Sequence, residues 1–414
     1  MKILTVSTYD IRPGAARSAY RMHKVLGEYG IDVQMLVQNK SSDDFTVMDN
    51  DNILKKIIGL ARPKIDQIPV QLYKKKSKTL FSPDWTPFND IVHKINEVKA
   101  DIVHFHWVSG GMIPLSQLSK IQAPIVWTLH DMWPFTGGCH YTEGCENFYL
   151  KCGKCKVLGS NKERDLSRYS FNVKKNAYGK VRQMTAIGLS KWITEEAKNS
   201  SLFKGVNIFH IPNFIDSEFF KPINKSVARN VFNLPQNKKL VLFGAVNPNG
   251  DKRKGYSQLI GALEKLNGVN DIELVIFGNT GSDDVPKLDY PAHYTGFLKD
   301  EVSVMMLYNA CDVIVVPSLQ ENLSDVIMAG QSCGVPVVCF KIGGNVDMVI
   351  HKQTGYLAKA FDQEEMAKGI AWTIEHTKEL GDNARKFIVN NFDKEVIIPK
   401  YISLYNKIVK PNNT

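Results

Sequence analysis

Short apolar runs alternate with amphipathic stretches along the chain, and this alternation restarts once near the middle. In the first half the apolar runs predict strands at residues 3–7, 33–37, 102–106, 125–130, 185–189 and 208–211. In the second half they predict strands at residues 240–243, 274–277, 293–295, 313–316 and 335–340. Apolar residues at helical spacing predict helices between them, notably over 256–266, 300–310 and 325–333. Repeated strand–helix alternation is typical of parallel sheets with helices on both faces.

The length of the chain favours two such domains rather than one. A chain of 414 residues exceeds what a single core usually holds and suits two large α/β domains. Periodicity is weakest over residues 212–235, which include three prolines. We therefore predict an α/β protein with two doubly wound, Rossmann-like domains, 1–212 and 213–395, which face each other across a cleft and are followed by a terminal helix over 396–414. In such sheets ligands bind at the carboxyl ends of the strands.

The composition is that of an ordinary globular protein. Apolar residues make up 43% of the chain and charged residues 23%, which excludes wholesale disorder. No apolar run approaches the ~20 residues of a membrane-spanning helix, and the first residues turn polar too soon for a signal peptide. We therefore expect a cytoplasmic protein.

Most of the net charge of +10 comes from one segment, residues 53–80. Eight lysines and arginines there stand against a single acid, Asp66, and aliphatic residues are interleaved with them. That mixture suits an element lying on an anionic membrane surface, which predicts a peripheral position on the inner face of the membrane; a solvated surface is the alternative. No nucleic-acid-binding motif accompanies the charge, so nucleic acid is not an expected partner.

One motif points to a known family. Residues 317–324 (PSLQENLS), which lead into residues 333–338 (CGVPVV), resemble the signature of the family 4 retaining glycosyltransferases, which have the GT-B fold. Further segments match this family in the expected order along nearly the whole chain: 101–107, 127–131, 211–213, Lys254-Gly255, 308–312, Gly343-Gly344 with Asp347, and 355–357. The segments of the first half look like those of a subgroup that builds bacterial surface polysaccharides.

The resemblance implies transfer of a hexose-type sugar from a nucleotide-sugar donor to a lipid-linked or cell-surface glycan, with retention of anomeric configuration. The acceptor hydroxyl would attack from the face that the diphosphate leaves, and the diphosphate would help to take the proton. No catalytic cofactor is expected, because helix N-termini and Lys254 neutralise the diphosphate. The terminal helix is expected to return to the first domain, as in the family.

The donor site is expected around residues 317–324. In the family the first glutamate of the signature contacts the transferred sugar, which makes Glu321 a catalytic candidate, although a carboxylate at a helix start can also serve as a cap. Lys254, a second catalytic candidate, is expected to neutralise the leaving diphosphate, with Arg253 beside it. The remaining donor-binding candidates are Gly296, Asn322, Leu323 and Ser324.

The acceptor side is expected in the first domain. His130, at the end of a predicted strand, matches a family histidine that contacts the sugar and supports catalysis; a histidine satisfied at a strand end is the alternative. Asp131 follows it, and the turn after the first strand supplies Arg12 and Gly14, where a helix N-terminus would face the ligand. Two further histidines that share one face of a strand are expected in the interior: His104 and His106.

Two positions depart from the family pattern. The second signature glutamate holds the donor ribose in the family, and here that position is Ala329; losing the carboxylate removes about 1.5–3 kcal/mol of charged hydrogen bonding. The arginine that usually follows the strand glycine is Ala245. Three interpretations stay open: the donor is held differently, the enzyme is weak, or the chain is a non-catalytic nucleotide-sugar or glycan-binding partner of a polysaccharide assembly system. Because Glu321 and Lys254 are present, we favour an active hexosyltransferase.

Four of the seven cysteines lie close together in a glycine-rich loop over residues 137–156: Cys139, Cys145, Cys152 and Cys155. The last two form a Cys-x-x-Cys pair that contains Gly153, as in zinc knuckles. A tetrahedral zinc ion would hold a loop with so little core of its own, and disulfides are less expected in the cytoplasm. The family subgroup has a similar cysteine-rich segment, which we interpret as shaping the acceptor side. The other three cysteines lie in apolar elements and are expected in the core.

Overall fold

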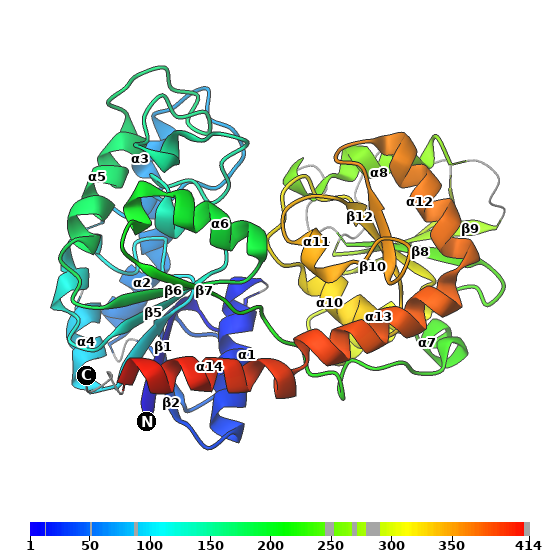
Figure 1. The fold of residues 1–414 in the computed structure, drawn as a ribbon, viewed down its shortest axis with the longest axis horizontal. Helices are drawn as coiled ribbons and strands as arrows, with labels where there is room; N and C mark the ends of the chain where they lie inside the picture. Colours follow the sequence, from blue (N-terminus) through cyan, green and yellow to red (C-terminus); the bar gives the residue numbers. More distant parts are fainter. Residues whose placement is uncertain are drawn as a thin grey trace. The chain divides into compact units, whose positions relative to one another are not determined.

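The computed structural model describes residues 1–12, 14–49, 52–86, 90–244, 252–266, 271–278 and 290–409. The chain divides into two compact units: unit 1 comprises Met1–Pro212 and Ile398–Thr414, and unit 2 comprises Asn213–Ile397. Each unit contains its own parallel sheet flanked by helices (Figure 1). The predicted architecture of two doubly wound α/β domains is therefore confirmed.

In its described residues, unit 1 contains seven parallel strands in the order β3-β2-β1-β4-β5-β6-β7. The strands are β1 (Lys2–Tyr9), β2 (Asp32–Asn39), β3 (Val47–Met48), β4 (Ile102–Phe105), β5 (Ile125–Leu129), β6 (Met184–Gly188) and β7 (Asn207–His210). Its helices are α1 (Ala15–Glu28), α2 (Ile53–Asp66), α3 (Ile68–Gln71), α4 (Ile91–Glu97), α5 (Leu166–Tyr178) and α6 (Lys191–Asn199). All the strands predicted for the first half are present. The additional one, β3, is a two-residue strand at the edge of the sheet.

The strands and helices of unit 1 bury different patterns of residues. In β1 all residues except those at the two ends are buried, because the strand is covered on both faces and paired on both sides. Ile3 stands opposite Val33 of β2 and Ile102 of β4. In α1 only one face is buried, with Met22 and Leu26 among the residues that pack inward. A continuous apolar run therefore marks the central strand, and helical spacing marks the helix.

The part of unit 2 that the structure describes contains six parallel strands in the order β10-β9-β8-β11-β12-β13. The strands are β8 (Lys239–Gly244), β9 (Ile272–Phe277), β10 (Ala292–Gly296), β11 (Val313–Val316), β12 (Val337–Phe340) and β13 (Gly355–Ala358). Its helices are α7 (Lys225–Val231), α8 (Tyr256–Leu263), α9 (Glu301–Ala310), α10 (Asp325–Ser332), α11 (Asn345–Met348), α12 (Gln363–Glu375) and α13 (Thr377–Phe392). The strands predicted for the second half are present, and β13 is additional.

The last helix, α14 (Lys394–Val409), begins in unit 2 and continues into unit 1. Its two tyrosines, Tyr401 and Tyr405, are fully buried. The Tyr405 hydroxyl lies 2.8 Å from Nδ1 of His104 on β4, and the Tyr401 hydroxyl donates to the carbonyl of Ile211 over 3.4 Å. The C-terminal part of the chain is thereby built into the core of unit 1.

Each sheet has one position at which the strand order reverses. In unit 1 the chain runs outward from β1 to β2 and β3, and then returns to the other side of β1 with β4. In unit 2 it runs outward from β8 to β9 and β10, and then returns beside β8 with β11. The loops after the two central strands lead away from each other at such a position, which is where doubly wound sheets bind their ligands.

A buried ion pair fastens α7 to the sheet of unit 2. The Arg229 guanidinium donates to Oδ2 of Asp312 over 2.7 Å and to three backbone carbonyls. Lys225 approaches Oδ1 of the same carboxylate at 2.7 Å. The two cations differ in burial, because the Arg229 side chain is 5% exposed and the Lys225 side chain is 43% exposed.

We expect Arg229→Met to lower the free energy of unfolding of unit 2 by about 3–5 kcal/mol, because it removes the buried partner of a buried carboxylate. Lys225→Met removes the exposed partner of the same carboxylate and should cost at most about 1 kcal/mol. Urea unfolding followed by hydrogen-exchange mass spectrometry reports on the peptides of unit 2 separately. Equal losses in the two variants would contradict the assignment.

Candidate functional site

The carboxyl ends of β8 and β11, the two central strands of unit 2, carry the predicted donor-side residues. After β8 comes a short 3₁₀ helix, η5 (Lys252–Lys254), and after β11 comes the loop with Glu321 that leads into α10. Nζ of Lys254 lies 2.9 Å from Oε2 of Glu321. Nη1 of Arg253 lies 3.7 Å from the same oxygen and donates to the carbonyl of Gln320 over 3.0 Å. The structure thus brings the predicted cations and the predicted carboxylate together.

The Glu321 carboxylate is buried and held as an anion. Its residue is 6% exposed, and Oγ of Ser318 donates to Oε2 over 3.2 Å. Burial raises the pKa of Glu321, but the charges of Lys254 and Arg253 and the hydrogen bonds outweigh burial and lower the pKa to about 2. At neutral pH this group therefore accepts hydrogen bonds and supplies negative charge, and it does not act as a proton donor.

Close backbone contacts hold these loops together. Gly255 caps α8 with a φ of 71°, and a Cβ at this position would lie 1.8 Å from the carbonyl oxygen of Pro317. Only glycine fits there. The N–H of Gly344 donates to the carbonyl of Glu321 over 3.1 Å. The Lys-Gly, 317–324 and Gly-Gly segments, which are far apart in the sequence, therefore build one site.

The loop beyond Glu321 ends in the N-terminus of α10. Ser324 caps this helix, with its Oγ accepting from the N–H of Ile327 over 3.5 Å. Asn322 and Leu323 are buried between Glu321 and the cap. The predicted donor-binding run thus leads directly into a helix N-terminus, whose first-turn N–H groups carry partial positive charge.

Three further positions were singled out in the sequence: Ala329, Gly296 and Ala245. Ala329 is a buried residue of α10, so this position of the helix carries a methyl group in place of a carboxylate. Gly296 ends β10, the edge strand, which is separated from β8 by β9. Its carbonyl accepts from the N–H of Gly278 over 2.7 Å. Ala245 lies outside the described residues.

In unit 1 the loops after β4 and β5 carry a pair of histidines. Nε2 of His130 lies 2.9 Å from Nδ1 of His106. Burial lowers the pKa of His130 to about 4, although the charge of Asp131 opposes this shift. His130 is therefore neutral at physiological pH and can donate or accept a hydrogen bond. His106 and His104 are buried, as predicted.

Asp131 is the centre of a polar cluster whose other members sequence reasoning did not assign to a site. Its Oδ2 accepts from Nε1 of Trp107 over 3.0 Å and lies 2.7 Å from Nδ1 of His140. Its Oδ1 accepts from the N–H of Trp133 over 2.9 Å. Burial raises the pKa of Asp131, but His140 and these hydrogen bonds outweigh it and lower the pKa. Trp107 and His140 both stand in segments noted in the sequence, yet nothing in the pattern indicated that they meet at Asp131.

The turn after β1 carries Arg12 and Gly14 at the same end of the sheet. The Arg12 guanidinium lies 4.0 Å from the centre of the Tyr9 ring, and Tyr9 stacks on Trp107 with 6.1 Å between ring centroids. Gly14 precedes α1 with a φ of 85°, and in the described residues no side chain caps this helix. Arg12 is thereby connected to the Asp131 cluster through two aromatic rings. Pro13 lies outside the described residues.

A buried lysine beneath this cluster carried no signal in the sequence, because it occupies an ordinary polar position of an amphipathic helix. Lys174 of α5 is fully buried, donates to the carbonyls of Trp133 and Thr136, and lies 3.7 Å from the centre of the Trp133 ring. Burial lowers the pKa of Lys174 to about 7, against the pull of Asp84. The lysine thus supports the segment that follows Asp131.

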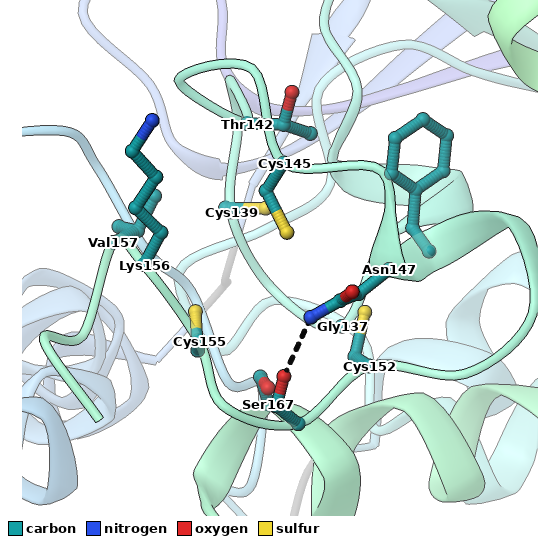
Figure 2. Close-up of a pocket in the computed structure, with 12 residues that line it drawn as sticks. Gly137, Cys139, Thr142, Cys145, Asn147, Cys152, Cys155, Lys156, Val157 and Ser167 are labelled. Carbon is teal, nitrogen blue, oxygen red and sulfur yellow. Dashed lines mark hydrogen bonds between the residues drawn. The ribbon is translucent and has the colours of Figure 1, made fainter. Parts of the chain in front are cut away.

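The four cysteines predicted to bind zinc line one small cavity in unit 1 (Figure 2). In the described part of the chain, no group of three or more His, Cys, Asp or Glu side chains is already arranged as metal ligands. The zinc site therefore stays a prediction. The other three cysteines are buried in unit 2, as predicted.

Sequence comparison supports one family over both units. The model of Glycosyltransferase Family 4 matches residues 13–219, and that of Glycosyl transferases group 1 matches residues 224–388. The chain is 28% identical over 163 residues to the capsular polysaccharide biosynthesis glycosyltransferase CapM of Staphylococcus aureus, which covers 38% of this chain and 40% of that one. It is 25% identical over 266 residues to the putative colanic acid biosynthesis glycosyl transferase WcaC of Escherichia coli. This match covers 61% of this chain and 62% of WcaC. Less than two thirds of each relative is matched.

Solved structures are similar over almost the whole chain. Sucrose-phosphate synthase from Thermosynechococcus elongatus has a TM-score of 0.67 at 18% identity, with 98% of both chains covered. HepE from Anabaena in complex with UDP-glucose has a TM-score of 0.65 at 18% identity, with 98% of this chain and 100% of that one covered. The two parallel-sheet units thus have the fold of GT-B glycosyltransferases. Since the two family models cover nearly all of both units, the chain belongs to the family 4, group 1 glycosyltransferases.

Proposed function

We propose that the protein is a retaining hexosyltransferase that transfers a sugar from a nucleotide-sugar donor to a lipid-linked or cell-surface glycan acceptor. The observation that carries this proposal is the buried Glu321 carboxylate, held by Lys254 and Arg253 where the strand order of unit 2 reverses. Family membership supports it, as do the relatives named for capsular and colanic acid biosynthesis and the UDP-glucose bound to HepE.

On the donor side, one group of residues binds the sugar and another binds the diphosphate. Ionised Glu321 accepts hydrogen bonds from hydroxyl groups of the hexose. Lys254 and Arg253 stabilise the negative charge that develops on the leaving diphosphate. The N–H groups at the start of α10 add a partial positive charge. With these groups in place the reaction requires no catalytic metal.

The acceptor hydroxyl attacks the anomeric carbon from the face that the diphosphate leaves. The bond from the anomeric carbon to the diphosphate oxygen breaks as the bond to the acceptor oxygen forms, and the departing diphosphate takes the hydroxyl proton. Anomeric configuration is therefore retained. This route does not need the pair of carboxyl groups, about 5–5.5 Å apart, that a retaining hydrolase uses.

The residues on the acceptor side hold the acceptor in position and take no part in bond making or breaking. Neutral His130, paired with His106, offers a hydrogen bond to a sugar hydroxyl. Asp131 is kept in place by Trp107 and His140. Arg12 and the N-terminus of α1 provide positive charge for the phosphate of a lipid-linked acceptor.

A donor screen tests the proposed activity. Purified protein is incubated with a panel of nucleotide sugars, with and without lipid-linked acceptors, and release of free nucleotide is followed over hours. Release from one donor would establish transfer and identify the sugar. Nucleotide-sugar binding without release from any donor would favour the alternative, a non-catalytic binding partner in polysaccharide assembly.

We expect Glu321→Gln to lower kcat by roughly 100-fold or more, because an interaction that strengthens in the transition state is lost. Donor affinity, measured by calorimetry, should fall much less. Because the pKa of Glu321 is lowered to about 2, the stabilisation from its ionised form is lost only as the pH falls toward that value. The pH–rate profile should therefore show no ionisation of this group in the neutral range. Glu364→Gln, which changes an exposed carboxylate on α12, is the control; unchanged turnover in Glu321→Gln would remove Glu321 from the site.

We also propose that unit 1 binds an anionic membrane through α2 and the residues that follow it, which would bring a lipid-linked acceptor to the enzyme. Aliphatic side chains there are 38–79% exposed: Ile53, Leu54, Ile57, Ile58, Leu60, Ile65, Ile68 and Leu72. The buried face of α2 is instead formed by Gly59, Arg62 and Asp66. Among the described helices none is long and apolar enough to cross a bilayer.

The charge beside these aliphatic residues selects the kind of surface. Lysines are interleaved with them or follow directly: Lys55, Lys56, Lys64, Lys74, Lys75, Lys76 and Lys78. An exposed aliphatic face flanked by lysines matches the boundary between acyl chains and anionic headgroups. A soluble protein rarely exposes so many large aliphatic residues in one segment without a partner.

Replacing Lys74, Lys75 and Lys76 together with Glu should weaken binding to vesicles that contain phosphatidylglycerol by roughly 100-fold or more, since each lysine near such a surface contributes about 1 kcal/mol. Vesicle sedimentation measures the effect. The matched control is Lys378→Glu, Lys386→Glu and Lys400→Glu, which changes the net charge equally at exposed positions elsewhere. Equal weakening in both triple variants would show a general charge effect, and unaltered binding in the first would exclude docking through this segment.

A further inference from the structure

The segment from 137 to 158 in unit 1 contains four cysteines and little regular structure. In the described residues its secondary structure is one 3₁₀ turn, η3 (Asn147–Tyr149), and an isolated β-bridge between Cys139 and Phe81. Cys139 and Cys155 belong to a small apolar cluster with Val157 and Leu158, and Phe148 and Cys152 join the main core of unit 1. In a segment with so little regular structure, a bound ion can add to the stability that this packing provides.

The side chains of these cysteines surround one cavity (Figure 2). Cys139, Cys152 and Cys155 are each 7% exposed, and all four thiols are unpaired. The cavity has a volume of about 10 Å³, which is room for roughly one water-sized particle. The size and lining of the cavity suit a single ion with sulfur ligands.

The backbone passes close to one of these sulfurs. A Cβ at position 137 would lie 2.9 Å from the sulfur of Cys152 and 2.4 Å from the carbonyl oxygen of Ser167, so glycine is required for this close approach. The glycine keeps the sulfur of Cys152 beside the cavity that the other cysteines line.

We propose that Cys139, Cys145, Cys152 and Cys155 bind one structural zinc ion. In the described residues the thiols do not yet stand as a set of metal ligands, so binding requires them to rotate toward the cavity and to release their protons. The four thiolates then surround the ion tetrahedrally, with Zn–S distances of about 2.3 Å. Lys156, which also lines the cavity, offsets part of the net negative charge of the zinc–thiolate centre.

His140 is the neighbouring residue that could compete as a ligand, and the structure assigns it another role. Its Nδ1 lies 2.7 Å from Asp131 and its Nε2 lies 2.9 Å from Oγ of Ser82, so both ring nitrogens are engaged. Cys139 precedes it directly, and the Cys139 carbonyl accepts from Oγ1 of Thr136 over 2.7 Å. A zinc ion bound at Cys139 would therefore fix the backbone that presents His140 to Asp131.

Metal analysis of untagged protein, purified under reducing conditions without chelator, tests the proposal. We expect about one zinc per chain, most of it lost in Cys152→Ser and in Cys155→Ser. Cys333→Ala, which changes a buried cysteine of unit 2, should keep its zinc. Removal of zinc with a chelator should lower the melting temperature, and added zinc should restore it.

Cobalt substitution keeps the test decisive if a cysteine variant fails to fold. Wild-type protein titrated with Co²⁺ should show thiolate-to-cobalt charge transfer in the near ultraviolet and the visible bands of a tetrahedral site. A folded wild-type protein that binds neither zinc nor cobalt would overturn the proposal. Thiol counts on the unreduced, unfolded chain that show the four cysteines paired as disulfides would overturn it as well. None of these measurements depends on glycosyl transfer.

Discussion

The reversal of strand order at the centre of each sheet is the constraint on which both clusters depend. Parallel strands are joined by crossovers, so the loops after two neighbouring central strands depart in different directions and leave space at the carboxyl ends. Lys254 and Glu321, 67 positions apart, face each other in that space, 2.9 Å between charged atoms. In unit 1 the same arrangement places Arg12 after β1 and His106 after β4 at one end of the sheet.

The two clusters differ in electrostatic character. In unit 2 a buried carboxylate stays ionised because two cations approach one of its oxygens, which suits chemistry in which a diphosphate gains negative charge. In unit 1 the histidine pair is neutral, since burial lowers the pKa of His130 to about 4. Aromatic rings and a single held carboxylate, Asp131, complete that cluster. Neutral donors and acceptors suit the recognition of sugar hydroxyls, where no charge has to be stabilised.

Two features of unit 1 have no counterpart among the donor-side residues. The cysteine segment abuts His140 and thereby the Asp131 cluster, and α2 turns its aliphatic residues outward. If both serve the acceptor, these two features belong to the acceptor side that we propose for unit 1. The proposed zinc ion would then act by positioning, through the backbone at Cys139, and the proposed membrane contact by bringing the acceptor close.

The sequence by itself determined the two-domain α/β fold and indicated most residues of the proposed donor site. Buried parallel strands appear as continuous apolar runs, and the 317–324 motif places Glu321 at a strand end. The short strands β3 and β13 were not predicted. A strand of two residues, or one that begins with glycine, does not form a continuous apolar run. Only the tertiary structure showed that Arg253 lies beside Glu321, that Trp107 and His140 meet at Asp131, and that Lys174 is buried. Such contacts join residues on different loops and helices, and no periodicity records them, because they depend on how the chain returns to the same end of a sheet.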